Sequence, residues 1–228
     1  GNAGENGAKA LAIEKMPITG GTSRTAGGYL ISVDSSLNKG ESVDGIDATM
    51  AYWHDLMEQG GDTGYPNYDK VEDVLGESGA VVDHMVQMGV PFNPDIVNFF
   101  GTYPVASVDG GGNVMMDSLE KAARDAGVEI LLDCTAEELI LEDGAVVGVK
   151  AATATEDLTI RAKSVILATG GMSQNPEMVA SYSPEITEVV SLASVGSTGD
   201  GIRMAEVAGA ARFDNYWSSL SGMALSAE

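Results

Sequence analysis

The segment that decides the fold is residues 9–28, KALAIEKMPITGGTSRTAGG. It begins with four small or branched apolar residues, 10–13, which predict a short buried strand of a parallel sheet. Glu14 follows this strand directly, and Lys15 comes next. In a doubly wound sheet, an acid at the carboxyl end of the second strand accepts hydrogen bonds from ribose hydroxyls. Residues 9–15 therefore predict the nucleotide-binding edge of an α/β domain.

Two pairs of glycines follow the acid, with hydroxyl-bearing residues between them. The pairs are Gly20-Gly21 and Gly27-Gly28, and the sequence TSRTA separates them. Because glycine has no Cβ, the backbone N–H groups of such a loop can approach a flat or anionic ligand closely. An ordinary strand and glycine-rich turn would show the same pattern, so other segments must decide between the two interpretations.

The segment resembles the fumarate reductase and succinate dehydrogenase flavoprotein family, in particular its soluble fumarate reductase, flavocytochrome c-like branch. In that branch the strand ends in Glu-Lys, followed by Pro, by Gly-Gly-(Asn/Thr)-Ser and by Ala-(Ala/Gly)-Gly-Gly. The matching segments here are 14–17 (EKMP), 20–23 (GGTS) and 26–28 (AGG). The resemblance extends from about residue 7 to residue 219.

A second motif lies at residues 162–172, AKSVILATGGM. Its apolar residues 165–168 predict another buried strand, and Thr169-Gly170-Gly171 predicts a sharp turn at the carboxyl end of that strand. Ligands of open α/β sheets bind at that edge. A strand followed by Ala-Thr-Gly-Gly resembles the second FAD-contacting segment of two-dinucleotide-fold flavoproteins.

A third motif, GSTGDG at residues 196–201, precedes a helix predicted over 202–208. Asp200 in this motif would serve as the N-cap of the helix, a role that needs no ligand. In the resembled family the equivalent Gly-Asp-Gly places its acid and the helix amino terminus against the flavin nucleotide. The two roles are compatible, and we favour cofactor binding.

The remaining segments predict helices followed by a small antiparallel sheet. Apolar residues at helical spacing predict helices over 44–60 and 69–88, the second with a break or bend near residues 76–79. The Asp-Gly at 143–144 predicts a β-hairpin turn, and in the resembled family the start of this hairpin, here Ala136, contacts the adenine end of FAD. Further predicted elements are a loop or irregular hairpin at 91–112, a helix at 113–126, a strand at 128–133, hairpin strands at 136–141 and 145–153, and a strand at 157–161.

Together these elements predict an α/β chain with the FAD-binding Rossmann-like fold of two-dinucleotide-binding-domain flavoproteins, with a small antiparallel β unit and truncated at both ends. Residues 1–228 would form a partial FAD-binding domain, with a helical insertion at 44–126 and the β unit at 128–161. By resemblance, a cap domain begins near residue 220, and the G-x-G-x-x-G turn lies upstream of residue 1. Without that turn, we expect the chain to bind FAD weakly or not at all.

Composition excludes several classes of protein. The chain of 228 residues has 34 acidic and 12 basic side chains, a formal net charge of −22, which argues against binding to nucleic acid. The single cysteine, Cys134, excludes an internal disulfide and lies in an apolar run typical of a core. His54 and His84 have no partners at metal-ligand spacing, so no metal site is predicted. No apolar run approaches the ~20 residues of a membrane helix, so no membrane insertion is expected.

The resemblance implies an FAD-dependent oxidoreductase that reduces an activated C=C bond of an α,β-unsaturated acid by hydride transfer from flavin N5. The proton-donating arginine of the family would lie beyond residue 228, so no catalytic residue is assigned within the chain, and the chain alone would be inactive. FAD supplies the redox chemistry. The residues expected to bind it are Glu14, Lys15, Gly21, Thr22, Ser23, Gly27, Gly28, Ala136, Thr169, Gly170 and Asp200.

Two departures from the family weaken the case for fumarate itself as substrate. In the family a basic residue precedes the glycines at the start of the helix predicted at 113–126, whereas the sequence here is SVD at 107–109. In addition, Ser221 stands where the fumarate-handling branch of the family usually has a histidine. The alternatives are a flavin dehydrogenase of a ketosteroid or an amino acid, and a non-catalytic flavin-binding module. A small unsaturated acid and a haem or other electron-donor domain are the expected partners. The compartment stays open between cytoplasm and cell envelope.

Overall fold

The computed structural model describes residues 2–37, 45–59, 67–95, 97–99, 103–184 and 190–211. The chain forms two compact units. The first contains residues 1–10 and 23–128, and the second contains residues 11–22 and 129–228. The boundary at 22–23 divides the glycine-rich loop, so Gly20-Gly21 and Gly27-Gly28 belong to different units.

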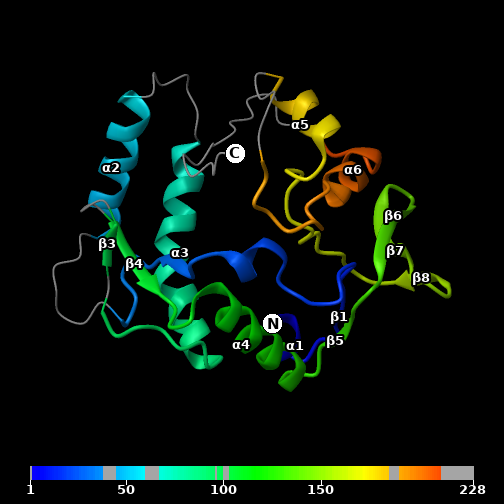
Figure 1. Ribbon diagram of the computed structural model, residues 1–228, viewed down its shortest axis with the longest axis horizontal. Coiled ribbons are helices and arrows are strands. Elements are labelled where there is room, and N and C mark those ends of the chain that lie inside the picture. Colours follow the sequence, from blue (N-terminus) through cyan, green and yellow to red (C-terminus); the bar gives the residue numbers. More distant parts are fainter. Residues whose placement is uncertain are drawn as a thin grey trace, which may run out of the picture. The chain divides into compact units, whose positions relative to one another are not determined.

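The first unit combines helices with a small antiparallel sheet (Figure 1). Its three strands are ordered β2-β4-β3, and both neighbouring pairs are antiparallel. The irregular hairpin predicted at 91–112 is thus the β3-β4 pair, whereas β2 was not predicted from the sequence. The elements are α1 (Asn2–Glu5), β2 (Tyr29–Ile31), α2 (Ile46–Gln59), α3 (Tyr68–Gln87), β3 (Val97–Phe99), β4 (Tyr103–Ser107) and α4 (Gly111–Asp125).

The helix α3 is continuous, so the break that the sequence allows near residues 76–79 is not present. The alternative, a bend at this point, stays a prediction. Of the two glycines in this stretch, Gly79 permits a close contact with another segment of the chain, and Gly76 does not. An added Cβ on Gly79 would overlap the carbonyl oxygen of Val33, while one on Gly76 would meet nothing within 4 Å. Ser78 supports the same contact, because its Oγ accepts a hydrogen bond from the N–H of Val33 at 3.0 Å. Gly79 therefore lets the chain after β2 lie directly on α3.

The core of the first unit lies where α3 and α4 meet the loop before α4. Met85, Val90 and Val108 are buried together, with exposed fractions of 7%, 3% and 4%. Partly buried apolar side chains pack around them: Leu30, Phe92, Met115 and Leu119. Because these residues come from β2, α3, α4 and the connecting loops, the predicted "insertion" at 44–126 shares one core with the segment that follows the glycine loop.

The second unit contains the predicted parallel pair. The strand β1 (Leu11–Ile13) lies parallel to β5 (Glu129–Leu131), with Ala12 opposite Ile130. The prediction of a parallel strand at residues 10–13 is confirmed. Its predicted burial is wrong, because Leu11 is 42% exposed and none of the three residues of β1 is buried. β1 has β5 as its one strand neighbour among the described residues, so much of its surface stays open.

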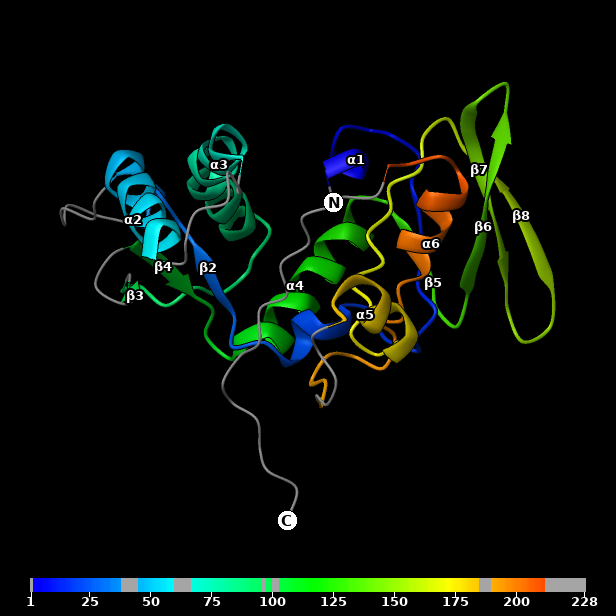
Figure 2. The ribbon, with the colours of Figure 1, turned by 90° about the horizontal axis from the view of Figure 1, so that it is seen from above.

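A three-stranded antiparallel sheet and two helices complete the second unit (Figure 2). The hairpin turn uses Asp143 and Gly144, both with positive φ, as an Asp-Gly turn of a hairpin requires. The hairpin and the strand at 157–161 were predicted correctly, and Cys134 is buried as expected, with 1% exposure. The elements are β6 (Thr135–Glu142), β7 (Ala145–Ala152), β8 (Asp157–Arg161), α5 (Pro176–Tyr182) and α6 (Asp200–Val207).

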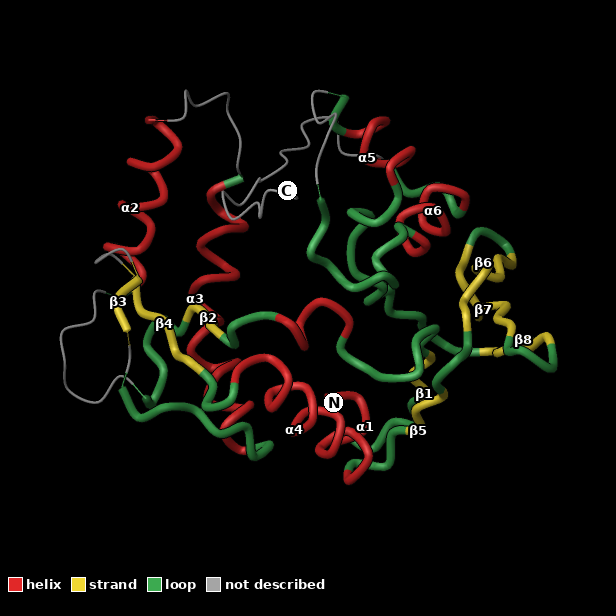
Figure 3. Tube along the Cα trace, in the orientation of Figure 1, coloured by secondary structure: helices red, strands yellow, loops and turns green. Residues whose placement is uncertain are grey.

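The predicted buried strand at 165–168 is not present. This segment is loop (Figure 3), and Ile166 and Leu167 are 84% and 39% exposed. A strand is defined by pairing, and no described strand forms a ladder with this segment. The apolar sequence therefore has the composition of an inner strand without a neighbour to bury it.

The two histidines have structural contacts. His84 Nε2 lies 3.0 Å from Glu5 Oε2, and the ring of His54 stacks on Tyr68 with centroids 3.8 Å apart. Within the described ranges, no three histidine, cysteine or carboxylate side chains are grouped to hold a metal ion. Among the same residues, no helix combines the length and the apolar character that spanning a bilayer requires.

Candidate cofactor site

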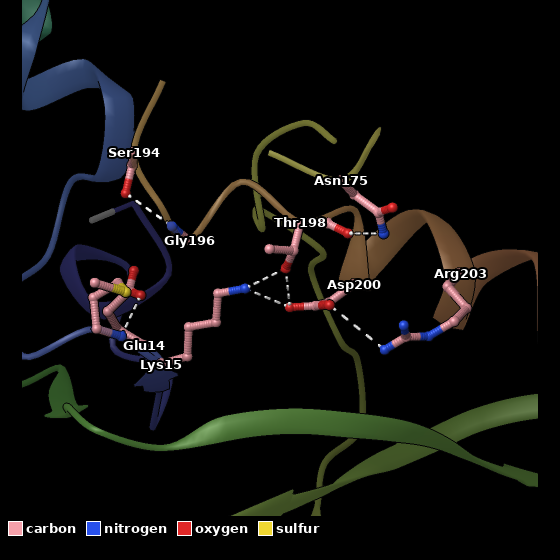
Figure 4. Close-up of polar contacts among 9 residues, drawn as sticks. Glu14, Lys15, Asn175, Ser194, Gly196, Thr198, Asp200 and Arg203 are labelled. Carbon is pink, nitrogen blue, oxygen red and sulfur yellow. Dashed lines mark hydrogen bonds and ion pairs between the residues drawn. The ribbon is translucent and has the colours of Figure 1, made fainter. Parts of the chain in front are cut away.

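The centre of the candidate site is an ion pair between two of the predicted residues, Lys15 and Asp200. Lys15 Nζ lies 2.6 Å from Asp200 Oδ2 and 2.6 Å from Thr198 Oγ1, and Thr198 Oγ1 donates to Asp200 Oδ2 at 3.0 Å. Figure 4 shows the Lys15 side chain extending from the end of β1 to the turn before α6. The side chains of Lys15 and Asp200 are 23% and 18% exposed. The two motifs therefore meet within the second unit.

Asp200 is the first residue of α6 and not its N-cap. The N-cap is Gly199, which adopts a left-handed φ of 79° and offers no side-chain cap. The N-cap interpretation of Asp200 is therefore wrong. As a first-turn acid, Asp200 is favoured by the helix dipole, and its carboxylate is turned toward Lys15 instead of toward the helix amides.

The charge state of Asp200 follows from these contacts. Burial raises the pKa of its carboxyl, but hydrogen bonds from Lys15 and Thr198 and the positive charges of Lys15 and Arg203 outweigh burial, so the pKa lies below its ordinary value of 3.8. Arg203, one helical turn on, approaches the other oxygen, with Nη2 3.5 Å from Oδ1. The site therefore holds an ionised carboxylate that two cations neutralise.

Glu14 is tied to its own backbone. Its Oε1 accepts a hydrogen bond from the N–H of Met16 at 2.8 Å (Figure 4). The backbone groups of Glu14 continue the pairing with the segment after β5, because its N–H donates to Leu131 and its C=O accepts from Cys134. The carboxylate is thus held at the carboxyl end of a parallel strand, where the sequence predicts a ribose-binding acid.

The turn at 169–171 packs directly against the start of α6. Gly199 N–H donates to the carbonyl of Gly171 at 3.0 Å, and an added Cβ on Gly201 would overlap Thr169 Oγ1. Gly170 has a left-handed φ of 75°. Only residues without a Cβ fit such close contacts at low cost. The turns of the second and third motifs therefore pack against each other, and Lys15 connects the first motif to the third.

Thr22 contacts the loop that leads into α6. Its Oγ1 accepts from the N–H of Ser194 at 3.0 Å and lies 3.3 Å from Ser197 Oγ. Its neighbour Gly21 has a positive φ of 46° and begins the 3-10 helix η1 (Gly21–Thr25). Thr22, predicted as a cofactor ligand, thus also supports the loop before α6.

The four remaining predicted residues have contacts of other kinds. Ser23, Gly27 and Gly28 belong to the first unit, where they contact the start of α4. Ala136 lies on β6, in the second unit, at a register irregularity between Ala136 and Glu138. Their roles in cofactor binding stay predictions.

Two side chains that the sequence did not single out hold the loop between α5 and α6. Gln174 Nε2 donates to the carbonyl of Ala193 at 2.8 Å. Asn175 is the N-cap of α5, accepting from Met178 N–H at 3.1 Å, and its Nδ2 donates to the carbonyl of Thr198 (Figure 4). The sequence Asn-Pro at 175–176 is a recognisable helix start, so Asn175 was within reach of a sequence argument.

This arrangement suits a nucleotide cofactor. It offers a carboxylate at a strand end, two hydroxyls, an ammonium group and several glycines with positive φ within one unit. A helix amino terminus adds a partial positive charge beside them. These are the groups that recognise ribose and phosphate, so the donor set fits a dinucleotide.

Comparison with known proteins identifies the family. The family described as "FAD binding domain" matches residues 2–221. The chain belongs to this family. Its cofactor is therefore FAD, and both the predicted α/β fold class and the resemblance to fumarate reductase flavoproteins are confirmed.

Individual relatives agree with this assignment. The chain is 30% identical to a "Probable fumarate reductase Ifc3" of Shewanella frigidimarina over 92% of the chain and 36% of that protein. It is 34% identical to a urocanate reductase of Eggerthella lenta over 93% of the chain and 36% of that protein. The open conformation of a flavocytochrome c3 fumarate reductase superposes with a TM-score of 0.81 at 28% identity, covering 92% of the chain and 37% of that structure. The chain thus spans little more than a third of these relatives.

Proposed function

We propose that this chain is part of an FAD-dependent oxidoreductase that reduces a carbon–carbon double bond activated by a neighbouring acid or carbonyl group. The observation that carries the proposal is the meeting of three separate motifs at Lys15, Thr169 and Asp200 within a chain of the FAD-binding family. Named relatives act on fumarate and urocanate, which are both unsaturated acids. That shared chemistry supports the proposed substrate class.

The proposed roles of the residues follow from their chemistry. Glu14 would accept hydrogen bonds from ribose hydroxyls, since it lies at the end of β1. Lys15 keeps Asp200 ionised and fixes the turn before α6. Thr169 and Gly170 would place backbone groups close to the cofactor. When bound, FAD supplies the hydride chemistry, and the protein supplies orientation and exclusion of water.

Ser23, Gly27 and Gly28 would complete the cofactor contacts, as the sequence predicts, and Ala136 would contact the adenine end. We assign no proton donor within this chain. A small unsaturated acid and a haem or other electron-donor domain are proposed partners. Ser221, which stands where the fumarate-handling branch carries histidine, lies outside the described residues and leaves the choice among unsaturated acids open.

The test uses the full protein that contains this chain. After purification and dialysis, the absorbance of bound flavin measures FAD, and oxidation of a reduced viologen dye measures activity with fumarate, urocanate and acrylate. We expect stoichiometric FAD and turnover with at least one of the acids. Ketosteroids and amino acids with an oxidised dye test the dehydrogenase alternatives. FAD without any turnover would favour the non-catalytic module, and a protein that retains no FAD would refute the proposal.

A further inference from the structure

Arg24 is a largely buried cation in the middle of the glycine-rich segment. Its side chain is only 11% exposed, although it follows the predicted cofactor residues Thr22 and Ser23 directly. Its Nη1 donates to Asn113 Oδ1 at 2.8 Å and to Asp117 Oδ1 at 2.7 Å. Its Nη2 lies 3.8 Å from Glu120 Oε2. The proposed cofactor chemistry gives this guanidinium no role, so its burial needs another explanation.

The three acceptors lie along one side of α4. Positions 113, 117 and 120 are separated by four and three residues, the spacing that places side chains on one helix face. A guanidinium has five donors in a planar fork and can bind several such acceptors at once. Arg24 therefore fastens the loop to two successive turns of α4.

Backbone contacts join the same loop to the first turn of α4. Gly112 N–H donates to the carbonyl of Ala26 at 2.9 Å, and an added Cβ on Gly112 would overlap the carbonyl oxygen of Ser23. Gly28, with a φ of 76°, approaches Gly111 so closely that an added Cβ would lie 2.8 Å from its Cα. The loop at 23–28 thus lies in direct contact with the first turn of α4, and it could move away only by breaking these contacts.

We propose that Arg24 is a positioning residue for the cofactor, holding Ser23, Gly27 and Gly28 on the start of α4 so that the loop is ordered before FAD binds. The inference rests on the proposed function, because the loop is the segment expected to contact the cofactor. Because an ordered loop loses little conformational entropy when FAD binds, preorganisation of the loop raises the affinity for FAD. Arg24 acts through the loop and needs no contact with FAD itself.

The matched control is another cation on the same helix. Lys121 pairs with Asp125 at 2.5 Å, but the two side chains are 76% and 64% exposed, and both partners belong to α4. Exposed pairs of this kind contribute little. Arg24→Gln and Lys121→Gln therefore remove the same charge from α4 and its surroundings but differ in the contact with the loop.

The first measurement follows the loop without the cofactor. Hydrogen exchange of the Gly112 amide, which donates to Ala26, reports whether the loop stays on α4. We expect Arg24→Gln to speed this exchange about tenfold or more, because hydrogen bonds to charged groups are stronger than those between neutral groups. Lys121→Gln should leave it within about twofold. Unchanged exchange in Arg24→Gln would overturn the inference.

The second measurement uses the full FAD-binding protein. We expect Arg24→Gln to weaken FAD binding about tenfold and to alter the visible circular dichroism of bound flavin, with Arg24→Lys intermediate and Lys121→Gln like wild type. Asp117→Asn replaces Arg24→Gln if far-ultraviolet circular dichroism shows the latter unfolded. Faster exchange with unchanged affinity and spectrum would overturn the positioning role. A wild-type protein without FAD would instead refute the proposed function, and the exchange result would distinguish the two failures.

Discussion

A single side chain, Lys15, connects parts of the chain that are 185 residues apart in sequence. It extends from the end of β1 and satisfies Asp200 and Thr198 together. Both members of the ion pair are less than a quarter exposed, so solvent screens the pair less than it screens the exposed pairs elsewhere in the chain. The pair therefore contributes to stability as well as to the shape of the site.

Replacing Lys15 with methionine should destabilise the chain by about 1–3 kcal/mol, because a partly buried carboxylate loses its strongest donor. Urea unfolding followed by circular dichroism gives the free energy of unfolding. Lys150→Met is the control, since Lys150 and Glu138 form a pair whose side chains are 51% and 54% exposed. The control should cost less than about 1 kcal/mol. Equal losses in the two variants would contradict a special contribution of Lys15.

The lowered pKa of Asp200 predicts how stability depends on pH. Because the folded pKa is below the unfolded value, the ionised carboxylate stabilises the fold above the unfolded pKa, and this stabilisation is lost as pH falls through the folded pKa. Wild type should therefore exceed Asp200→Asn in stability at pH 7. The difference should shrink once the pH falls below about 4. Urea midpoints of both proteins from pH 7 to pH 3 test this, and a gap that widens in acid would contradict it.

The sequence could predict the members of the site but not all of their partners. Lys15 and Asp200 were both identified as cofactor residues, yet their mutual ion pair depends on how β1 and α6 pack, which no local pattern encodes. Gln174 went unpredicted for the same reason, since its amide binds the backbone of a loop that has no sequence signature. The residues of each local motif could be predicted from the sequence, whereas contacts between residues far apart in the chain could not.

At the scale of elements, two glycines of α3 behave differently although they are three residues apart. Gly79 faces the backbone of Val33, with Ser35 N also within 2.7 Å of an added Cβ, while Gly76 faces open space. In an exposed helix interior, alanine is favoured over glycine by about 0.5–1 kcal/mol. Packing against backbone reverses this preference, because a backbone cannot rotate away as a side chain can.

Gly76→Ala should therefore stabilise the chain by about 0.5–1 kcal/mol, and Gly79→Ala should destabilise it by about 1–3 kcal/mol. Thermal and urea unfolding of the two variants measure the opposite signs. The pair controls for helix propensity, since both changes occur in α3. Stabilisation by both substitutions would mean that the contact between α3 and residues 33–35 is looser than described.

Elements with their own local signal were predicted well, and elements that depend on a neighbour were not. The Asp-Gly turn and the alternating strands around it gave β6 and β7 within one residue at their shared turn. The strand β2 has three residues, too few for a periodic pattern, and its pairing with β4 decides its existence. Conversely, residues 165–168 have strand composition but no ladder partner among the described strands.

At the scale of the whole molecule, acidity is the dominant property. A formal charge of −22 on 228 residues makes the compact state repel itself, because folding brings like charges closer together. Local ion pairs such as Lys15–Asp200 oppose this effect, but the chain has 34 acidic and only 12 basic residues, so most of its acidic charge has no basic residue to balance it. The two contributions respond to salt in opposite directions, since screening weakens both attraction and repulsion.

Repulsion should dominate, so the free energy of unfolding should rise by about 1 kcal/mol between low salt and 0.15 M NaCl, where the Debye length falls to about 8 Å. Urea midpoints at pH 7 measure the change. The double variant Glu72→Lys, Asp73→Lys replaces two exposed acids of α3 and should reduce the salt dependence without touching the cofactor site. A wild-type midpoint that falls as salt is added would show that the ion pairs outweigh the net charge, and would assign them a larger share of stability than their exposure suggests.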